Sequence, residues 1–114
     1  MLRSRALISY NEDGSKIGHN VEWNIRNKIF DARDMYTGQE LAWTQVIFHE
    51  PVQLTLHDRD GETEWDITVR GTAEEIFHAI SLAYEPTLHE FGGTPMFEGM
   101  TKLDNGKYDI TLGS

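Results

Sequence analysis

Residues 51–70, PVQLTLHDRDGETEWDITVR, decide the fold that this sequence predicts. Two runs of alternating apolar and polar residues flank Asp60–Gly61, a pair typical of the two-residue turn that closes a β-hairpin. Folding about this pair places every apolar residue opposite an apolar partner, and a slip of one residue would turn the whole set to the other face. The resulting cross-strand pairs are Val52–Val69, Leu54–Ile67, Leu56–Trp65, His57–Glu64 and Arg59–Glu62.

A helix is predicted directly after this hairpin, from Thr72 to about Tyr84. Thr72 and Glu75 have the spacing of a capping box, in which each side chain bonds the backbone N–H of the other residue. Pro86 limits the helix, because the residue before a proline disfavours helical geometry. One face is apolar at helical spacing and is expected to cover the sheet. This face consists of Ala73, Ile76, Phe77, Ile80, Ala83 and Tyr84.

A second hairpin is predicted around Asn105–Gly106, because both residues of this pair tolerate the positive φ that a two-residue turn requires. The expected cross-strand pairs are Thr101–Ile110, Lys102–Asp109, Leu103–Tyr108 and Asp104–Lys107. Gly99 then faces Leu112, and its missing side chain indicates a bulge or a close approach by the helix.

The first 40 residues have the weakest patterning. Strands are expected at residues 5–10, 21–25 and 41–49, and Pro51 marks an edge or a strand start. Residues 1–40 either add strands to the sheet or form an arm that lies over the domain.

These elements predict one α+β domain over residues 1–114, built as a two-layer sandwich of one helix on a mostly antiparallel sheet. Residues 41–114 form its core. The hairpin–helix–hairpin order of residues 51–112, ββαββ, resembles the β-grasp fold of ubiquitin-like domains. The resemblance is one of element order, and it implies a fold without implying an activity.

Composition and charge favour a soluble protein in the cytoplasm. The 114 residues are 39% hydrophobic and 25% charged, with no cysteine and no apolar run near the roughly 18 residues of a membrane span. The net charge is −9, and residues 36–114 hold fourteen of the nineteen acidic side chains. We therefore expect neither nucleic acid nor membrane as a direct partner. The charge either maintains solubility or steers a cationic or nucleic-acid-binding protein to this surface.

Histidine and carboxylate side chains give only weak patterns for metal or acid–base chemistry. Glu74, Glu75 and His78 share a helical face, but the tight spacing of a zinc motif is missing. Three further pairs bring an imidazole near a carboxylate, although none has a nucleophile beside it. These pairs are His49–Glu50, His57–Glu64 and His89–Glu90. We expect no catalytic residue and no metal site.

Residues 91–94, Phe-Gly-Gly-Thr, faintly resemble a phosphate loop. They lack its lysine and follow the helix, whereas a phosphate loop precedes one. A turn is the better interpretation, and no cofactor or small-molecule substrate is expected.

Protein recognition is the function that this sequence favours. Four aromatic residues in the least patterned region are candidate anchors for a partner or for self-association. They are Trp23, Phe30, Tyr36 and Trp43. Alternatively, these side chains cover the far side of the same core. The leading hypothesis is a non-catalytic interaction module that binds through the sheet edge, the aromatic segment or both.

Two alternative functions stay open. The first is an inhibitor of phage or viral type that mimics nucleic acid through an acidic surface. Its residues are Asp58, Asp60, Glu62, Glu64 and Asp66. The second is a small structural component of a viral or other assembly.

Overall fold

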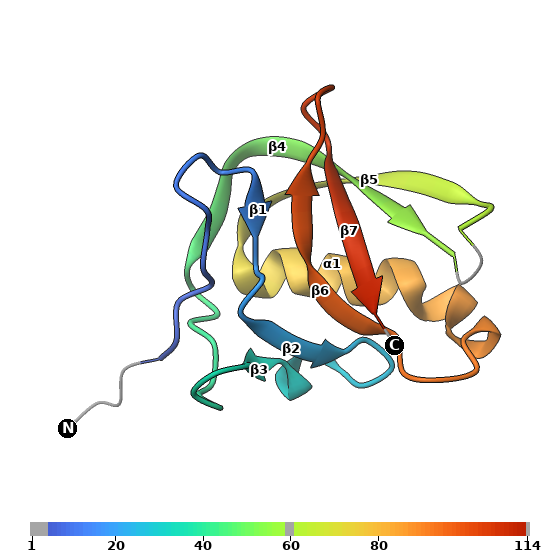
Figure 1. Cartoon of the computed structure of the whole chain (residues 1–114), viewed down its shortest axis with the longest axis horizontal. Coiled ribbons are helices and arrows are strands. Elements are labelled where there is room, and N and C mark those ends of the chain that lie inside the picture. The colour runs from blue at the N-terminus through green and yellow to red at the C-terminus, as the bar shows by residue number, and fades with distance from the viewer. Residues whose placement is uncertain (1–4, 59–60, 114) are drawn as a thin grey trace.

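The computed structural model describes residues 5–58 and 61–113. Within them, one helix packs on an open, mostly antiparallel sheet of seven strands (Figure 1), so the predicted α+β class is confirmed. The strands are β1 (Lys16–Ile17), β2 (Val21–Asn24), β3 (Arg33–Asp34), β4 (Val46–His57), β5 (Glu64–Thr72), β6 (Met96–Lys102) and β7 (Tyr108–Gly113). The helix is α1 (Ala73–Tyr84), and short 3-10 helices lie at η1 (Ile29–Asp31) and η2 (Glu85–Glu90).

The sheet has the strand order β3-β2-β6-β7-β4-β5, and β1 also pairs with β6. Only β4 and β7 are parallel among the strand pairs of the described residues. In Figure 1, α1 lies across the sheet behind β6 and β7, and the side chains between the two layers form the core. The first strand of the first hairpin, β4, and the last strand of the second, β7, therefore lie side by side in the middle of the sheet, although they are distant in sequence.

The first hairpin has the predicted register. Val52 pairs with Val69, Leu54 with Ile67, Leu56 with Trp65 and His57 with Glu64. The predicted Asp60 turn and the Arg59–Glu62 pair lie outside the described residues. The strand expected at residues 41–49 begins instead at Val46 and continues through Pro51. A register irregularity between Phe48 and Val52 accommodates this proline, which has no backbone N–H to donate.

The predicted register of the second hairpin is wrong by one residue. Thr101 pairs with Asp109 and Lys102 with Tyr108, because the loop contains three residues, Asp104 to Gly106. Gly106 has a φ of 87°, whereas no described residue other than glycine has a positive φ. Asn105 therefore does not adopt the two-residue turn, and the loop is a three-residue turn whose last residue is a left-handed glycine.

Gly99 marks a bulge in β6, as its missing side chain indicated. The register shifts between Phe97 and Met100, and Gly99 has a φ of 113°. The expected pairing of Gly99 with Leu112 was wrong, because Leu112 pairs with Phe97. Of the two alternatives for Gly99 the structure has the bulge, and the backbone that lies close to this glycine is that of Ile17 and His19. A β-carbon at Gly99 would lie 3.1 Å from the carbonyl oxygen of Ile17, a tight contact, and the positive φ further disfavours a side chain here.

The described part of residues 1–40 packs on the domain. It contributes β1, β2 and β3 to the sheet and buries Ile8, Ile17 and Val21 in the core. Residues 5–10 form two isolated bridges, Ala6–Leu41 and Tyr10–Ile17, where a strand was expected. The side-chain amide of Gln45 holds this segment, donating to the Ile8 carbonyl at 3.1 Å and accepting from the Ile8 N–H at 2.7 Å.

The capping box at the start of α1 is present as predicted. The Glu75 N–H donates to the Thr72 hydroxyl at 3.3 Å, and the Thr72 N–H donates to the Glu75 carboxylate at 3.2 Å. The helix ends at Tyr84, and its apolar face is buried except for a partly exposed Ala83.

Replacement of Thr72 by alanine is expected to lower the free energy of unfolding by about 1 kcal/mol, because it removes the acceptor for an otherwise unpaired helix N–H. Thr72→Ser keeps the hydroxyl and serves as the control. Urea unfolding followed by circular dichroism measures both variants, and equal stability of the two would contradict a role for the cap.

Candidate functional site

The parallel strands β4 and β7 separate toward their carboxyl ends. They pair at only two positions, Leu54–Tyr108 and Thr55–Asp109. The next donor on β4, the backbone N–H of His57, is directed instead to the hydroxyl of Tyr84, 3.4 Å away. The ladder stops there, and the two strands enclose an open groove, which we call the notch.

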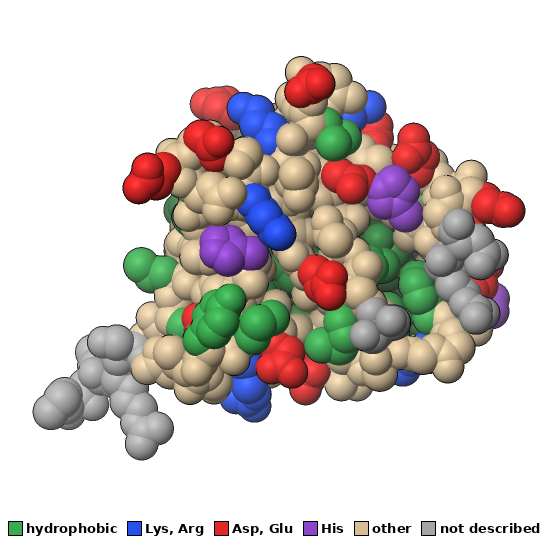
Figure 2. Space-filling view, in the orientation of Figure 1, with side chains coloured by type: hydrophobic (Ala, Val, Ile, Leu, Met, Phe, Trp, Pro, Cys, Tyr) green, Lys and Arg blue, Asp and Glu red, His purple; other side chains and the backbone are tan. Residues whose placement is uncertain are grey.

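The notch has a volume of about 710 Å³ and combines segments that are distant in sequence. Figure 2 shows the surface from the same side as Figure 1. The described residues that line the notch are His57, Asp58, Gly61, Phe91, Gly92, Gly93, Thr94, Pro95 and residues 109–113. It therefore lies between the first hairpin, the loop after η2 and the last strand.

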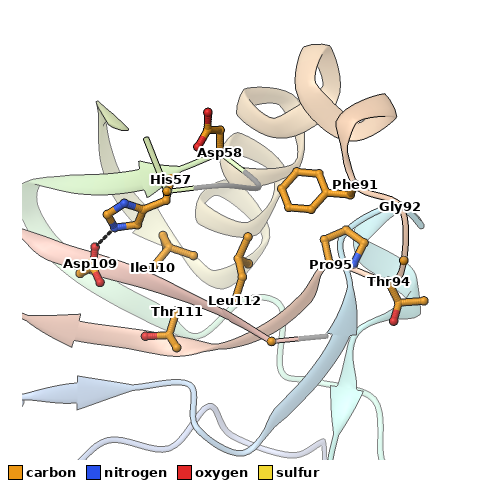
Figure 3. A pocket seen from close by; sticks show the side chains of 13 residues that line it. His57, Asp58, Phe91, Gly92, Thr94, Pro95, Asp109, Ile110, Thr111 and Leu112 are labelled. Carbon is orange, nitrogen blue, oxygen red and sulfur yellow. Dashed lines mark hydrogen bonds and ion pairs between the residues drawn. The ribbon is translucent and has the colours of Figure 1, made fainter. Parts of the chain in front are cut away.

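Four apolar side chains line part of the notch. In Figure 3, Phe91 and Pro95 face Ile110 and Leu112 across the opening. The ring of Phe91 packs edge-on against Tyr84 at a centroid distance of 6.3 Å. Apolar side chains of a bound segment would be removed from water here.

The loop of residues 91–95 is held in place by residues around β2. The guanidinium of Arg26 donates to the carbonyls of Phe91 at 2.6 Å and Gly93 at 3.0 Å. The Ile25 N–H donates to the Pro95 carbonyl at 3.0 Å. Because these bonds anchor the loop at both ends, this wall of the notch is already formed without a ligand.

The outer rim of the notch is polar. The imidazole Nε2 of His57 bonds the Asp109 carboxylate, drawn as the dashed line in Figure 3. Its Nδ1 lies 3.5 Å from the Glu64 carboxylate. The sequence indicated the His57–Glu64 pair, but not Asp109, which arrives through the parallel pairing of β4 and β7.

Backbone groups of β7 point into the notch. Paired residues in an antiparallel ladder alternate between hydrogen-bonded and non-bonded positions. The Leu103 N–H donates to the Lys107 carbonyl at 2.7 Å, and the Lys102 N–H donates away from β7, to Ser15. Lys107 and every second residue after it on β7 therefore direct their backbone groups toward β6. The residues between them, including Ile110 and Leu112, direct theirs to the opposite side. Leu112 pairs with β6 on one side, and no strand of the described residues pairs with it on the other.

Tyr84 lies beneath the point where β4 and β7 separate, and its hydroxyl is close to the His57 N–H. Burial raises the pKa of Tyr84 to about 12, the His57 N–H opposes the rise, and the negative charge of Asp109 adds to it. The hydroxyl accepts the His57 N–H at 3.4 Å, at the point where the β4–β7 ladder stops.

The four predicted aromatic anchors divide into two buried and two exposed side chains. Trp23 stacks on Phe77 at 5.2 Å, and Trp43 packs edge-on against the same ring at 5.8 Å. Both indoles belong to this chain's own core and present no surface to a partner, which agrees with the alternative weighed from the sequence. Phe30 and Tyr36 are 66% and 75% exposed, and their role as anchors stays a prediction.

The predicted acidic surface is partly neutralised by neighbours. Asp66 accepts from Lys107 Nζ at 2.6 Å and from the Thr55 hydroxyl at 2.8 Å, and these bonds lower the pKa of Asp66. Glu64 faces His57, whereas Glu62 is exposed and Asp60 lies outside the described residues. Figure 2 shows acidic side chains spread over this face without gathering in one patch.

Other candidate chemistry finds no support in the described ranges. His78 and His89 do not line the notch, and no three His, Cys, Asp or Glu side chains within residues 5–58 and 61–113 group as metal ligands. The helices of this part of the chain are too short or too polar to cross a bilayer.

Comparison with protein-family models, with curated proteins and with solved structures finds no match for this chain.

Proposed function

We propose that this chain is a non-catalytic interaction module that binds an extended segment of a partner protein in the notch, as a strand added beside β7. The observation that carries this proposal is the edge of β7 beyond Asp109, where Leu112 pairs with no strand of the described residues on the side that faces a groove of about 710 Å³. The backbone N–H and C=O of Leu112 supply the donor and acceptor that an added strand requires.

The preformed wall of the notch favours binding. Ordering a loop on association costs free energy, and Arg26 has already ordered the loop of residues 91–95. The apolar side chains inside the notch and the polar rim suit the two faces of one strand, whose side chains alternate in direction.

A catalytic use of the rim has less support. Acid–base chemistry by His57 needs a reacting group within hydrogen-bond reach. The hydroxyls among the described lining residues belong to Thr94 and Thr111, and neither bonds the imidazole. Both ring nitrogens of His57 face carboxylates, an arrangement that orders the rim.

We also propose that the core of this domain has a β-grasp-like strand order. The order β5-β4-β7-β6, with β4 and β7 parallel at its centre and α1 on one face, supports a β-grasp-like core to which β1, β2 and β3 are added. In this interpretation the notch is a local opening between the two central strands.

The nucleic-acid-mimic alternative is the weaker proposal. It needs a dense set of free carboxylates, and the ion pairs of Asp66 with Lys107 and of Glu64 with His57 reduce that set. Its expected signature is binding to a basic protein that weakens steeply with salt.

A displayed library of random 12-residue peptides, selected on the intact chain, tests the leading proposal. We expect enriched peptides whose binding shifts the amide resonances of residues 109–113 in ¹⁵N NMR spectra. Methylating alternate backbone nitrogens of one such peptide is expected to abolish binding in one register and to spare it in the other, because a strand presents every second N–H to its neighbour.

The two methylated peptides serve as controls for each other, since they have the same side chains and differ only in which backbone nitrogens are methylated. Equal binding of both, or enriched peptides that shift only resonances far from β7, would contradict strand addition. Light scattering of the chain alone measures its molar mass and so shows whether it self-associates.

A further inference from the structure

We infer that a second copy of this chain pairs with the free edge of β5, so that two copies form a dimer with one continuous sheet. The two β5 strands are antiparallel, and a two-fold axis passes between the two Ile67 residues. The inference goes beyond the proposed function and does not depend on the notch, because β4 separates β5 from β7.

The strand β5 forms one edge of the sheet (Figure 1). Its pairing with β4 is regular from Glu64 to Val69, and no strand of the described residues pairs with its other side. Edge strands commonly avoid pairing with another chain through a proline, a bulge or a charge that points inward, and this stretch has none of them. At the opposite edge, β3 has only two residues to offer.

Four residues of β5 direct their backbone groups to the free side. The Asp58 N–H donates to the Thr63 carbonyl at 3.0 Å, so Thr63 and every second residue after it direct their backbone groups toward β4. The residues between them direct theirs outward, and no backbone group of the described chain bonds them. These residues are Glu64, Asp66, Thr68 and Arg70.

The sequence of β5 is complementary to itself about Ile67. With the axis at this residue, Glu64 of one copy lies opposite Arg70 of the other, and Asp66 lies opposite Thr68. Each of these pairs joins two residues that direct their backbone groups outward, so all four residues gain partners in one ladder. Their side chains share the exposed face of the sheet, where opposite charges on neighbouring strands attract.

Arg70 is the cation that a second copy would engage. It is exposed, and no hydrogen bond or ion pair joins it to another residue in the described part of the chain. The Glu64 side chain is 65% exposed, and its carboxylate lies 3.5 Å from His57 Nδ1. Glu64 and Arg70 are six residues apart on one strand, or about 20 Å, so their charges can meet only between two copies.

The inner face of the edge is also complementary. The axis at Ile67 places this side chain opposite its own copy and places Trp65 opposite Val69. Trp65 and Ile67 are only partly buried in the single chain, although they pack on the core. A facing strand removes more of their apolar surface from water.

Other symmetric registers are less favourable. An axis at Asp66 places two carboxylates opposite each other, and like charges destabilise such a pair. An axis at Thr68 places Arg70 opposite Asp66, whose carboxylate already accepts from Lys107 at 2.6 Å. Registers farther from the middle of the strand pair fewer of the four outward residues. The axis at Ile67 therefore fits best.

Sedimentation equilibrium of the full chain and of charge variants tests the inference. At about 0.15 M salt, repulsion between two chains of net charge −9 is screened beyond about 8 Å. We expect a monomer–dimer equilibrium that Arg70→Glu or Glu64→Arg weakens by about tenfold or more, because two attractions become two repulsions. The double variant, Glu64→Arg with Arg70→Glu, is expected to restore the dimer, because opposite charges face each other again.

Two controls accompany the charge variants. Arg33→Glu makes the same change of charge at the exposed, opposite edge of the sheet and is expected to leave the dimer unchanged. Thr68→Pro removes an N–H that is directed to the free side, and a proline is tolerated at such a position of an edge strand. It is expected to abolish the dimer, whereas Thr68→Ala keeps the N–H and the dimer. Circular dichroism verifies that each variant is folded.

The outcomes separate this inference from the proposed function. A chain that is monomeric at every concentration overturns the inference and leaves the notch proposal standing, because peptides in the notch contact β7. A dimer that neither single charge variant weakens forms through another surface and also overturns it. Weakening by both single variants without restoration by the double variant contradicts the pairing of Glu64 with Arg70 and overturns the proposed register.

Discussion

Replacing Trp23 with alanine is expected to lower the free energy of unfolding by about 3–5 kcal/mol, the range for deleting a large aromatic side chain from a core. Trp23 is fully buried on β2 and contacts Phe77 of α1 and Phe97 of β6, with ring centroids 5.2 and 5.9 Å away. Its removal leaves a cavity where strand, strand and helix meet. The loss in stability therefore measures how much the packing of β2 on α1 and β6 contributes to the stability of the domain.

Urea unfolding followed by circular dichroism and by tryptophan fluorescence measures this loss. Phe30→Ala is the matched control, because Phe30 is 66% exposed and its removal is expected to cost under about 1 kcal/mol. Comparable losses for the two variants would contradict the packing of β2 on α1.

Asp34→Asn is expected to destabilise the protein by about 2 kcal/mol at pH 7, since hydrogen bonds to a charged group contribute about 1.5–3 kcal/mol. The buried carboxylate of Asp34 accepts from the Asn20 amide at 2.8 Å and from the backbone N–H groups of Tyr36 and Thr37 at 2.9 and 2.8 Å. In the variant, an amide N–H group faces the Asn20 amide, and one donor loses its acceptor.

The effect of Asp34 is expected to depend on pH in a defined direction. Burial would raise the pKa of Asp34, but the bonds from Asn20, Thr37 and Tyr36 outweigh it and hold the pKa below its ordinary value. A carboxyl whose folded pKa is lowered stabilises the fold above its unfolded pKa, near 3.9, and loses this contribution as the pH falls through the folded pKa.

Urea unfolding between pH 7 and pH 2.5 tests this expectation. The stability difference between the native chain and Asp34→Asn is expected to be constant above about pH 5 and to shrink below about pH 4. Asp31→Asn, an exposed carboxylate three residues away, is the control with little effect. A difference that stays constant to pH 2.5 would contradict the charged state of Asp34.

The same side-chain network accounts for the weak periodic pattern of the first 40 residues. The Asn20 side chain donates to the Leu7 carbonyl and accepts from the Ser9 N–H. The Gln45 side chain, from a different part of the chain, hydrogen-bonds both backbone groups of Ile8. These contacts join residues 11 to 37 positions apart, and they replace the strand ladder that alternation would have revealed. Sequence patterning detects regular elements, whereas side-chain amides that hold an irregular segment leave no periodic signal.

The two hairpins show the limit of local signals. In the first, alternation over both strands allows one register only, since any slip exposes the apolar face. In the second, Asn105–Gly106 is compatible with a two-residue turn and with a three-residue turn that ends in Gly106, and the structure adopts the latter. A strong turn signal therefore located the hairpin without selecting its register.

By itself, the sequence determined the features whose causes are local: the register of the first hairpin and the capped helix with its apolar face. The notch was decided only by the tertiary structure. It requires β4 and β7 to meet in parallel and then separate at Tyr84, with Phe91 and Asp109 brought in from other segments. Such a site depends on pairing between residues that are more than 50 positions apart, and no short-range pattern encodes where that pairing ends.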